Sequence, residues 1–202
     1  MIASGVLVGG GADAAPKDKV PMQVWATGAP VQGSFAQLDR SANGITAKVR
    51  TDQTARHAYT VWFAVFNDPA NCSPDPLGEP SIPSCGEDDV FDQDQRDAAL
   101  ISVVYAGGAV ANAAGRIQID GSQVIGQVGG PGQVVVGRAD DGAFLESPVT
   151  GVTNPMGAEV HLVLQDHGMA HAGHELREQQ ITQFLGACNT SCEDLQFAIF
   201  MP

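Results

Sequence analysis

The chain has 202 residues, of which 44% are hydrophobic and only 16% are charged. This composition excludes an intrinsically disordered protein and predicts one globular domain with a sizeable core. The net charge of −13 at pH 7, without any cluster of Lys and Arg, excludes nucleic acid as the natural partner and favours cations or basic partners. The 24 glycines and 12 prolines favour short strands joined by turns.

The first 14 residues differ from the rest of the chain. They form a short apolar stretch that is rich in small residues and ends in Ala12-Asp13-Ala14. We interpret residues 1–14 as the remnant of a signal peptide or as a disordered tail, because no Lys or Arg precedes the apolar run as in a complete signal peptide. Residues 15–202 are then a single β-rich domain. No later segment has the roughly 18 consecutive apolar residues of a membrane span.

Four cysteines occur as two pairs that are close in sequence. Cys72 and Cys85 flank one turn-rich loop, and Cys188 and Cys192 flank a shorter one. Four cysteines allow three pairings, and the short loops favour Cys72–Cys85 together with Cys188–Cys192. Because local disulfides form and persist in oxidising compartments, we expect a secreted or periplasmic protein.

The hydrophobic pattern predicts strands rather than helices. Residues 58–66 are apolar on both faces, as in a strand at the centre of a sheet. Residues 45–50 alternate between apolar and polar, as in a strand with one exposed face. The segment 175–185 fits a short helix or an extended edge strand. The other predicted strands are 22–27, 98–105, 116–120, 123–128, 133–137, 144–149, 158–165 and 195–200.

These elements predict an all-β fold, mainly antiparallel. Many short strands separated by Gly and Pro turns favour a β-sandwich or a barrel-like fold with long disulfide-pinned loops and at most one short helix. The side chains expected in the core are those of Trp62, Phe63, Val65, Val103, Leu162, Leu164 and Phe197.

A long loop over residues 67–97 contains the first cysteine pair and an acidic run. Loops of this length in a compact domain are usually functional or pinned. The carboxylates of Asp92, Asp94 and Asp97 are a candidate calcium site of the weak extracellular kind, although the EF-hand pattern is absent. The alternative is a solvated acidic loop without a bound ion.

Four of the five histidines lie within 14 residues: His161, His167, His171 and His174. The even separation of His161 and His167 puts both rings on one face of a strand. The Gly- and Ala-rich residues that follow would let the other two fold back. Imidazole binds zinc, copper and nickel, so that this segment is a candidate site for a divalent transition metal. The alternative is a set of solvated surface histidines.

No motif for covalent catalysis or phosphate binding is present. The chain lacks a G-x-S-x-G elbow, a Gly-rich phosphate loop and an H-E-x-x-H helix motif. A catalytic thiolate is not expected because all four cysteines are assigned to disulfides. We therefore predict no catalytic residues.

Several segments of the chain resemble uncharacterised secreted bacterial β-rich proteins, over residues 44–200. The resemblance implies a secreted domain with two local disulfides, and it implies no activity and no catalytic residues. The segments that carry it are Tyr59-Thr60-Val61-Trp62, Val65-Phe66-Asn67, Cys72, Cys85-Gly86, Gly157-Ala158-Glu159-Val160-His161-Leu162, Cys188, Cys192 and Gln196-Phe197-Ala198.

The functional expectation is an exported non-catalytic β-sandwich that acts as a surface or matrix protein or as a partner-binding module. A protein partner and self-association both stay open. The first alternative is an exported copper- or zinc-binding protein that uses the segment 161–174. The second is a hydrolase whose site is assembled from residues distant in sequence.

Overall fold

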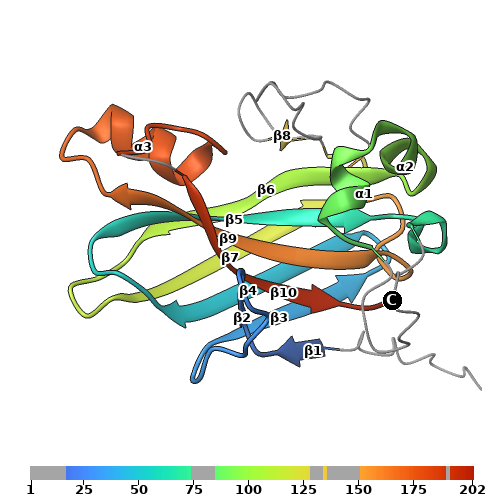
Figure 1. The fold of residues 1–202 in the computed structure, drawn as a ribbon, viewed down its shortest axis with the longest axis horizontal. Coiled ribbons are helices and arrows are strands. Elements are labelled where there is room, and N and C mark those ends of the chain that lie inside the picture. Colours follow the sequence, from blue (N-terminus) through green and yellow to red (C-terminus); the bar gives the residue numbers. More distant parts are fainter. Residues whose placement is uncertain (1–16, 74–84, 128–133, 136–150, 190–191) are drawn as a thin grey trace, which may run out of the picture.

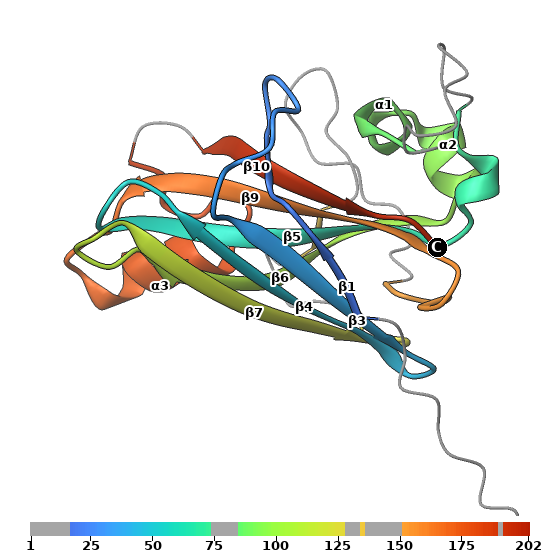
Figure 2. The same cartoon turned by 90° about the horizontal axis from the view of Figure 1, so that it is seen from below.

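The computed structural model describes residues 17–73, 85–127, 134–135, 151–189 and 192–202. Two antiparallel sheets, not closed into a barrel, form a β-sandwich, which confirms the predicted fold class (Figures 1 and 2). The smaller sheet has the order β1 (Lys17–Val20), β3 (Phe35–Ser41), β4 (Gly44–Asp52) and β7 (Arg116–Val124). The larger sheet has the order β2 (Gln23–Val24), β10 (Glu193–Phe200), β9 (Glu159–Met169), β5 (His57–Phe66), β6 (Ile101–Val110) and β8 (Val134–Val135).

The segment predicted to be central is β5, which pairs with β9 on one side and β6 on the other. Its two faces belong to two different apolar clusters. The inward face packs in the core between the sheets, and the outward face packs under the helices. The inward residues are Tyr59, Val61, Phe63 and Val65, and the outward residues are Trp62, Ala64 and Phe66.

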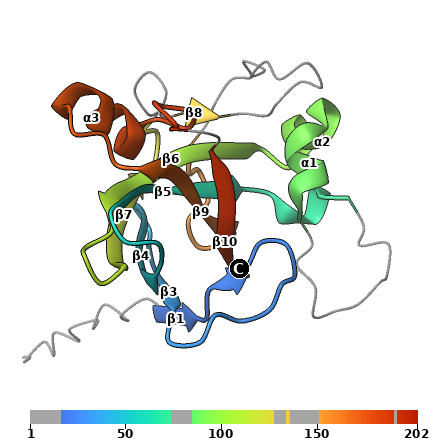
Figure 3. The same ribbon diagram turned by 60° about the vertical axis from the view of Figure 1, so that its left-hand side comes forward.

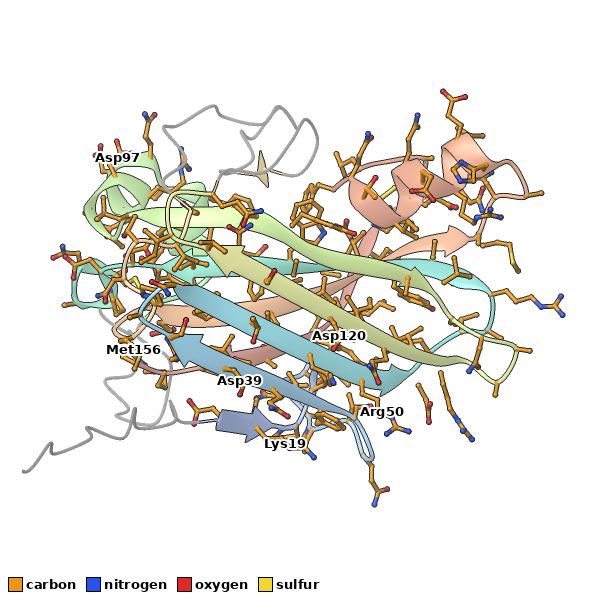
Figure 4. The ribbon with its side chains drawn as sticks, turned by 180° about the vertical axis from the view of Figure 1, so that it is seen from behind. Lys19, Asp39, Arg50, Asp97, Asp120 and Met156 are labelled. Atoms are coloured by element: carbon orange, nitrogen blue, oxygen red, sulfur yellow. A yellow bond between two sulfur atoms is a disulfide. The ribbon has the colours of Figure 1, made fainter. Side chains whose placement is uncertain are left out.

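The outward face of the four-stranded sheet is polar. Along β4, Ile45, Ala47 and Val49 are buried, whereas the residues between them are exposed, as their alternation predicts. Figure 4 looks onto this face, with Asp39 and Asp120 labelled on it.

Most of the predicted core is confirmed. Six of the seven side chains expected there are buried: Trp62, Phe63, Val65, Val103, Leu162 and Leu164. Phe197 is only partly buried because it faces outward from β10, where its ring meets that of Trp25 at 5.8 Å.

Three α-helices lie in the described part of the chain, where at most one was expected. The acidic run forms α1 (Glu87–Phe91) and α2 (Gln93–Ala98), and residues 175–185 contain α3 (His174–Thr182). The carboxylates of the run explain the two short helices, since Asp89 accepts from the Gly86 amide at 2.8 Å and Asp92 accepts from the Gln95 amide at 3.0 Å. A single-turn 3₁₀ helix covers Pro69–Asn71.

Several strands begin or end at other residues than the sequence predicts. β3 was not predicted, and β2 covers only part of 22–27. β7 runs through 116–120 and ends at Val124, so that it includes only the start of the predicted strand 123–128. Strand β6 begins at Ile101 and β9 extends to Met169. Residues 1–14 and the predicted strand 144–149 lie outside the described residues.

Both predicted disulfides are present, Cys72–Cys85 with a Cα–Cα distance of 5.1 Å and Cys188–Cys192 with 5.6 Å. The first attaches α1 to the end of β5, and the second joins the segment after α3 to the start of β10. Within the described ranges, no helix has both the length and the hydropathy that a membrane crossing requires.

Candidate functional site

A cleft of about 230 Å³ lies on the outward face of the six-stranded sheet. Strands β5, β9 and β10 form its floor. Helices α1 and α2 stand at one end of this sheet and α3 at the other (Figures 1 and 3). Residues of α1 and two residues that follow α3, Phe184 and Leu185, border the cleft. Trp25 and Val103 of β6 complete the described lining, so that the cleft combines residues from seven segments of the chain.

Aromatic side chains form much of the cleft wall. The ring of Trp62 packs edge-on against Phe184 at 5.1 Å, and Trp25 packs edge-on against Phe197 at 5.8 Å. Phe91 of α1 and Leu185 remain 44% and 50% exposed. Large apolar side chains that border a concavity and stay exposed are typical of a binding surface.

The polar end of the cleft is built around Asp194 on β10. Its Oδ1 accepts a hydrogen bond from Nε2 of Gln165 on β9 at 3.1 Å. Burial raises the pKa of Asp194 to about 6; the hydrogen bond from Gln165 opposes this shift and the charge of Glu87 adds to it. The carboxylate is therefore ionised at neutral pH. No Lys or Arg lies among the described residues that line the cleft.

The amide of Gln165 is only half satisfied. The residue is 3% exposed, and its Oε1 has no hydrogen-bond partner in the described part of the chain. Buried polar atoms are nearly always paired, so that an unpaired acceptor beside a cleft indicates a place for a donor group of a ligand.

A shift in strand register places Asp194 at the cleft. Asp194 pairs with Gln165, but Gln196 pairs with Leu164, so that β10 has one extra residue between these pairs. Gln196 faces inward, where its Oε1 accepts from the hydroxyl of Thr51. Without the extra residue Asp194 would share that inward face; with it, the carboxyl group faces outward.

Next to the acidic end lies a buried His–Glu pair. His161 lines the cleft, and its Nε2 donates to Oε1 of Glu159 at 2.7 Å. Glu159 is fully buried and also accepts from the amide of Cys85 at 3.4 Å. The pair fixes the ring of His161 and occupies its Nε2. No Ser, Thr or free Cys is found among the lining residues that the structure describes.

The four histidines of the predicted metal site do not come together. His161 and His167 share the outward face of β9, but six residues of strand separate them by about 20 Å. The Nε2 atom of His171 is 3.2 Å from the carbonyl oxygen of Ala187. His174, on α3, is 80% exposed and lies 3.7 Å from Glu178.

His167 instead lies beside the second disulfide. Its Nδ1 is 3.4 Å from Sγ of Cys192 and 3.8 Å from Sγ of Cys188. These three residues form a group with the spacing of metal ligands, although both sulfurs are in a disulfide. Burial lowers the pKa of His167, so that the ring is neutral at pH 7.

The predicted calcium ligands stay in solvent. Asp92, Asp94 and Asp97 are all exposed, and Asp92 uses its Oδ1 to cap α2. They do not form one of the close ligand groups found in the described residues. The structure thus gives the acidic run a local role, the formation of α1 and α2.

The cleft itself was not anticipated from the sequence. Its aromatic residues lie far apart in the sequence, and the local pattern around each of them indicates only a side chain of the hydrophobic core. The available signal was Phe197, because the alternation of β10 puts it opposite the buried Ala198. Comparisons with family models, with curated proteins and with solved structures found no match to this chain.

Proposed function

We propose that the protein is an exported, non-catalytic β-sandwich that binds a cationic group on an apolar stem in the cleft of the six-stranded sheet. The two local disulfides support export. The observation that carries the binding proposal is the pairing of an ionised carboxylate, Asp194, with Oε1 of Gln165, an acceptor that has no partner among the described residues, at the end of an aromatic cleft.

The charge of the cleft favours a cation. Glu87 and Asp194 are both acidic, and no basic Lys or Arg among the described lining residues neutralises them. Residues 57–202 hold four Lys and Arg against 19 Asp and Glu, so that the wider field has the same sign. An ammonium group has three N–H donors and no acceptor, which suits a carboxylate beside an amide oxygen.

The cleft walls favour an apolar stem on that cation. Aromatic rings attract cations through their faces and remove the apolar part of a ligand from water. The volume of about 230 Å³ is small, which suits one ring or one long side chain rather than a large ligand. Such a group occurs in free amines and in the Lys and Arg side chains of a partner protein.

The described lining residues include no Ser, Thr or free Cys, so that no hydroxyl or thiol nucleophile stands beside the Glu159–His161 pair, which favours binding. The Glu159–His161 pair then acts as a hydrogen-bonding wall whose geometry is fixed before the ligand arrives.

The test uses two probes that differ in charge. Benzylamine is a cation at pH 7.5, and benzyl alcohol is a neutral molecule of similar size. Calorimetry should show benzylamine binding with a Kd on the order of 1 mM and benzyl alcohol binding at least about tenfold more weakly. Asp194→Asn should remove this preference, whereas Asp120→Asn, on the far face of the sandwich, should keep it.

Two further arms separate the sources of the cation. Lysine and arginine with blocked amino and carboxyl groups are titrated in parallel with benzylamine. Tighter binding of the blocked amino acids indicates a side chain of a protein partner, and tighter binding of benzylamine indicates a free amine. Equal affinity of benzylamine and benzyl alcohol, or no effect of Asp194→Asn, would contradict the proposal.

A further inference from the structure

The second disulfide and His167 have the geometry of a metal site whose sulfur ligands are oxidised. The two N–S distances from Nδ1 of His167 are 3.4 Å to Cys192 and 3.8 Å to Cys188. In a tetrahedral zinc site with Zn–N near 2.0 Å and Zn–S near 2.3 Å, the nitrogen and sulfur ligands are about 3.5 Å apart. The ring nitrogen is thus already at ligand distance from both sulfurs.

The sequence spacing agrees with this geometry. Cys188 and Cys192 are separated by three residues, and metal-binding cysteine pairs typically have two to four residues between them. His167 comes from β9, and the two cysteines lie directly before β10, the strand that pairs with β9. Reduction would free two sulfurs that need to separate to about 3.8 Å, the S–S distance in the same tetrahedron.

A second hydrogen bond fixes the imidazole ring from its other side. Nε2 of His167 is 2.9 Å from the hydroxyl oxygen of Thr60, and this hydroxyl oxygen accepts from the indole N–H of Trp62 at 2.8 Å. Nδ1 itself lies 3.1 Å from the carbonyl oxygen of Gly186, so that in the oxidised protein Nδ1 carries the proton and donates it to Gly186, while Nε2 accepts from the Thr60 hydroxyl. Metal binding at Nδ1 would replace the bond to Gly186 and move the ring proton to Nε2, which would then donate to Thr60. Metal-binding histidines usually have such an outer partner, which fixes the tautomer.

We infer that the protein has a redox-gated site for a thiolate-binding metal ion, Zn²⁺ or Cu⁺, formed by His167, Cys188 and Cys192. A thiol or phosphine reductant transfers two electrons to the Cys188–Cys192 disulfide and yields two thiols. The metal then replaces both thiol protons, which go to solvent, and takes Nδ1 of His167 as its third protein ligand. With the disulfide intact the site is closed to metal.

The accessibility of the disulfide permits this chemistry. Cys188 and Cys192 are both partly exposed, and Cys192 lines the cleft. In the other disulfide Cys85 is 3% exposed and Cys72 is partly exposed, so that a reductant has one accessible sulfur there and two at Cys188–Cys192. A reductant should therefore reach Cys188–Cys192 before Cys72–Cys85.

The test titrates the full-length protein with Co²⁺, whose thiolate complexes absorb in the near ultraviolet. The protein is reduced with a phosphine, freed of reductant without air, and compared with the oxidised protein. The reduced form should bind one Co²⁺ with thiolate absorption, lose it to Zn²⁺, and gain thermal stability with metal. The oxidised form should show no such absorption.

Variants assign the ligands. Cys188→Ser with Cys192→Ser should abolish the absorption, and His167→Asn should weaken Co²⁺ binding at least about tenfold. His161→Gln, on the same face of β9, should leave it unchanged, as should Cys72→Ser with Cys85→Ser. Circular dichroism checks the fold of each variant. Absence of Co²⁺ binding by the reduced wild-type protein overturns the inference, as does absorption that survives in the folded Cys188/Cys192 variant.

Discussion

Nε2 of Gln165 on β9 donates a hydrogen bond to Oδ1 of Asp194 on β10 across 3.1 Å. This bond holds the carboxylate at the end of an aromatic cleft, beside an amide oxygen that has no partner within the described ranges of the chain. A cationic ligand group would satisfy both acceptors. The Gln165–Asp194 pair therefore favours a cationic ligand, and the titration of Asp194 makes the stability of the protein depend on pH.

Asp194→Asn should stabilise the protein at neutral pH. The pKa of Asp194 is about 6 in the folded protein against 3.8 for a free side chain, so that the folded state binds more protons between these values. The stabilising contribution of the protonated carboxyl is present below about pH 4 and is lost as the pH rises through 6. The free energy of unfolding of Asp194→Asn should therefore exceed that of the wild type, and this difference should grow between pH 4 and pH 7 to about 1–3 kcal/mol.

Urea unfolding of both proteins from pH 4 to pH 8 measures this difference. Asp120→Asn serves as the control, since Asp120 is exposed on the far face. A difference that stays constant with pH would show that Asp194 does not titrate near 6.

Phe91→Ala should weaken benzylamine binding severalfold with little loss of stability. Phe91 is 44% exposed in the free protein and lines the cleft, so that its ring contributes more to a bound ligand than to the core. Calorimetric affinity and the urea midpoint are measured on the same preparation. A loss of stability above about 1 kcal/mol would instead assign Phe91 to the fold.

Leu162→Ala should destabilise the protein by about 2–5 kcal/mol, because Leu162 is fully buried between the sheets. Val124→Ala is the matched control, since Val124 is 53% exposed on β7 and its truncation should cost less than about 0.5 kcal/mol. Chemical denaturation gives both values. A similar cost for the two variants would contradict the assignment of the core.

Removing the first disulfide should reduce both stability and binding. Cys72→Ser with Cys85→Ser opens a loop with a sequence separation of 13, and the chain-entropy model gives about 3 kcal/mol for a loop near this length. Because α1 follows directly after Cys85, its residues Glu87 and Phe91 should also lose their fixed place at the cleft. The thermal midpoint and the benzylamine Kd report the two effects; unchanged binding in the folded variant would show that α1 holds its position independently.

The sequence predicts the parts of the fold whose patterns are local. The apolar run of β5, the alternation of β4 and the two disulfides each depend on residues close in the chain. Strand β3 is hidden because its inward face includes a charge. Arg40 lies among the buried residues, and its guanidinium donates to the carbonyls of Pro155 and Ala158 at 2.7 Å.

The candidate site could not be predicted, because it depends on long-range arrangement. The outward position of Asp194 results from one extra residue in β10, which no periodicity reveals. In the same way, the even spacing of His161 and His167 gives their common face but not their partners, Glu159 for one and the second disulfide for the other.

Nuclear magnetic resonance of the ¹⁵N-labelled protein, titrated with benzylamine at pH 7.5, reports both whether the cation binds and where it binds. Binding in the cleft should give saturable shifts of the indole N–H of Trp25 and of the amides of α1 and of Asp194. Shifts confined to β3, β4 and β7, or no saturable shift at any residue, would contradict it.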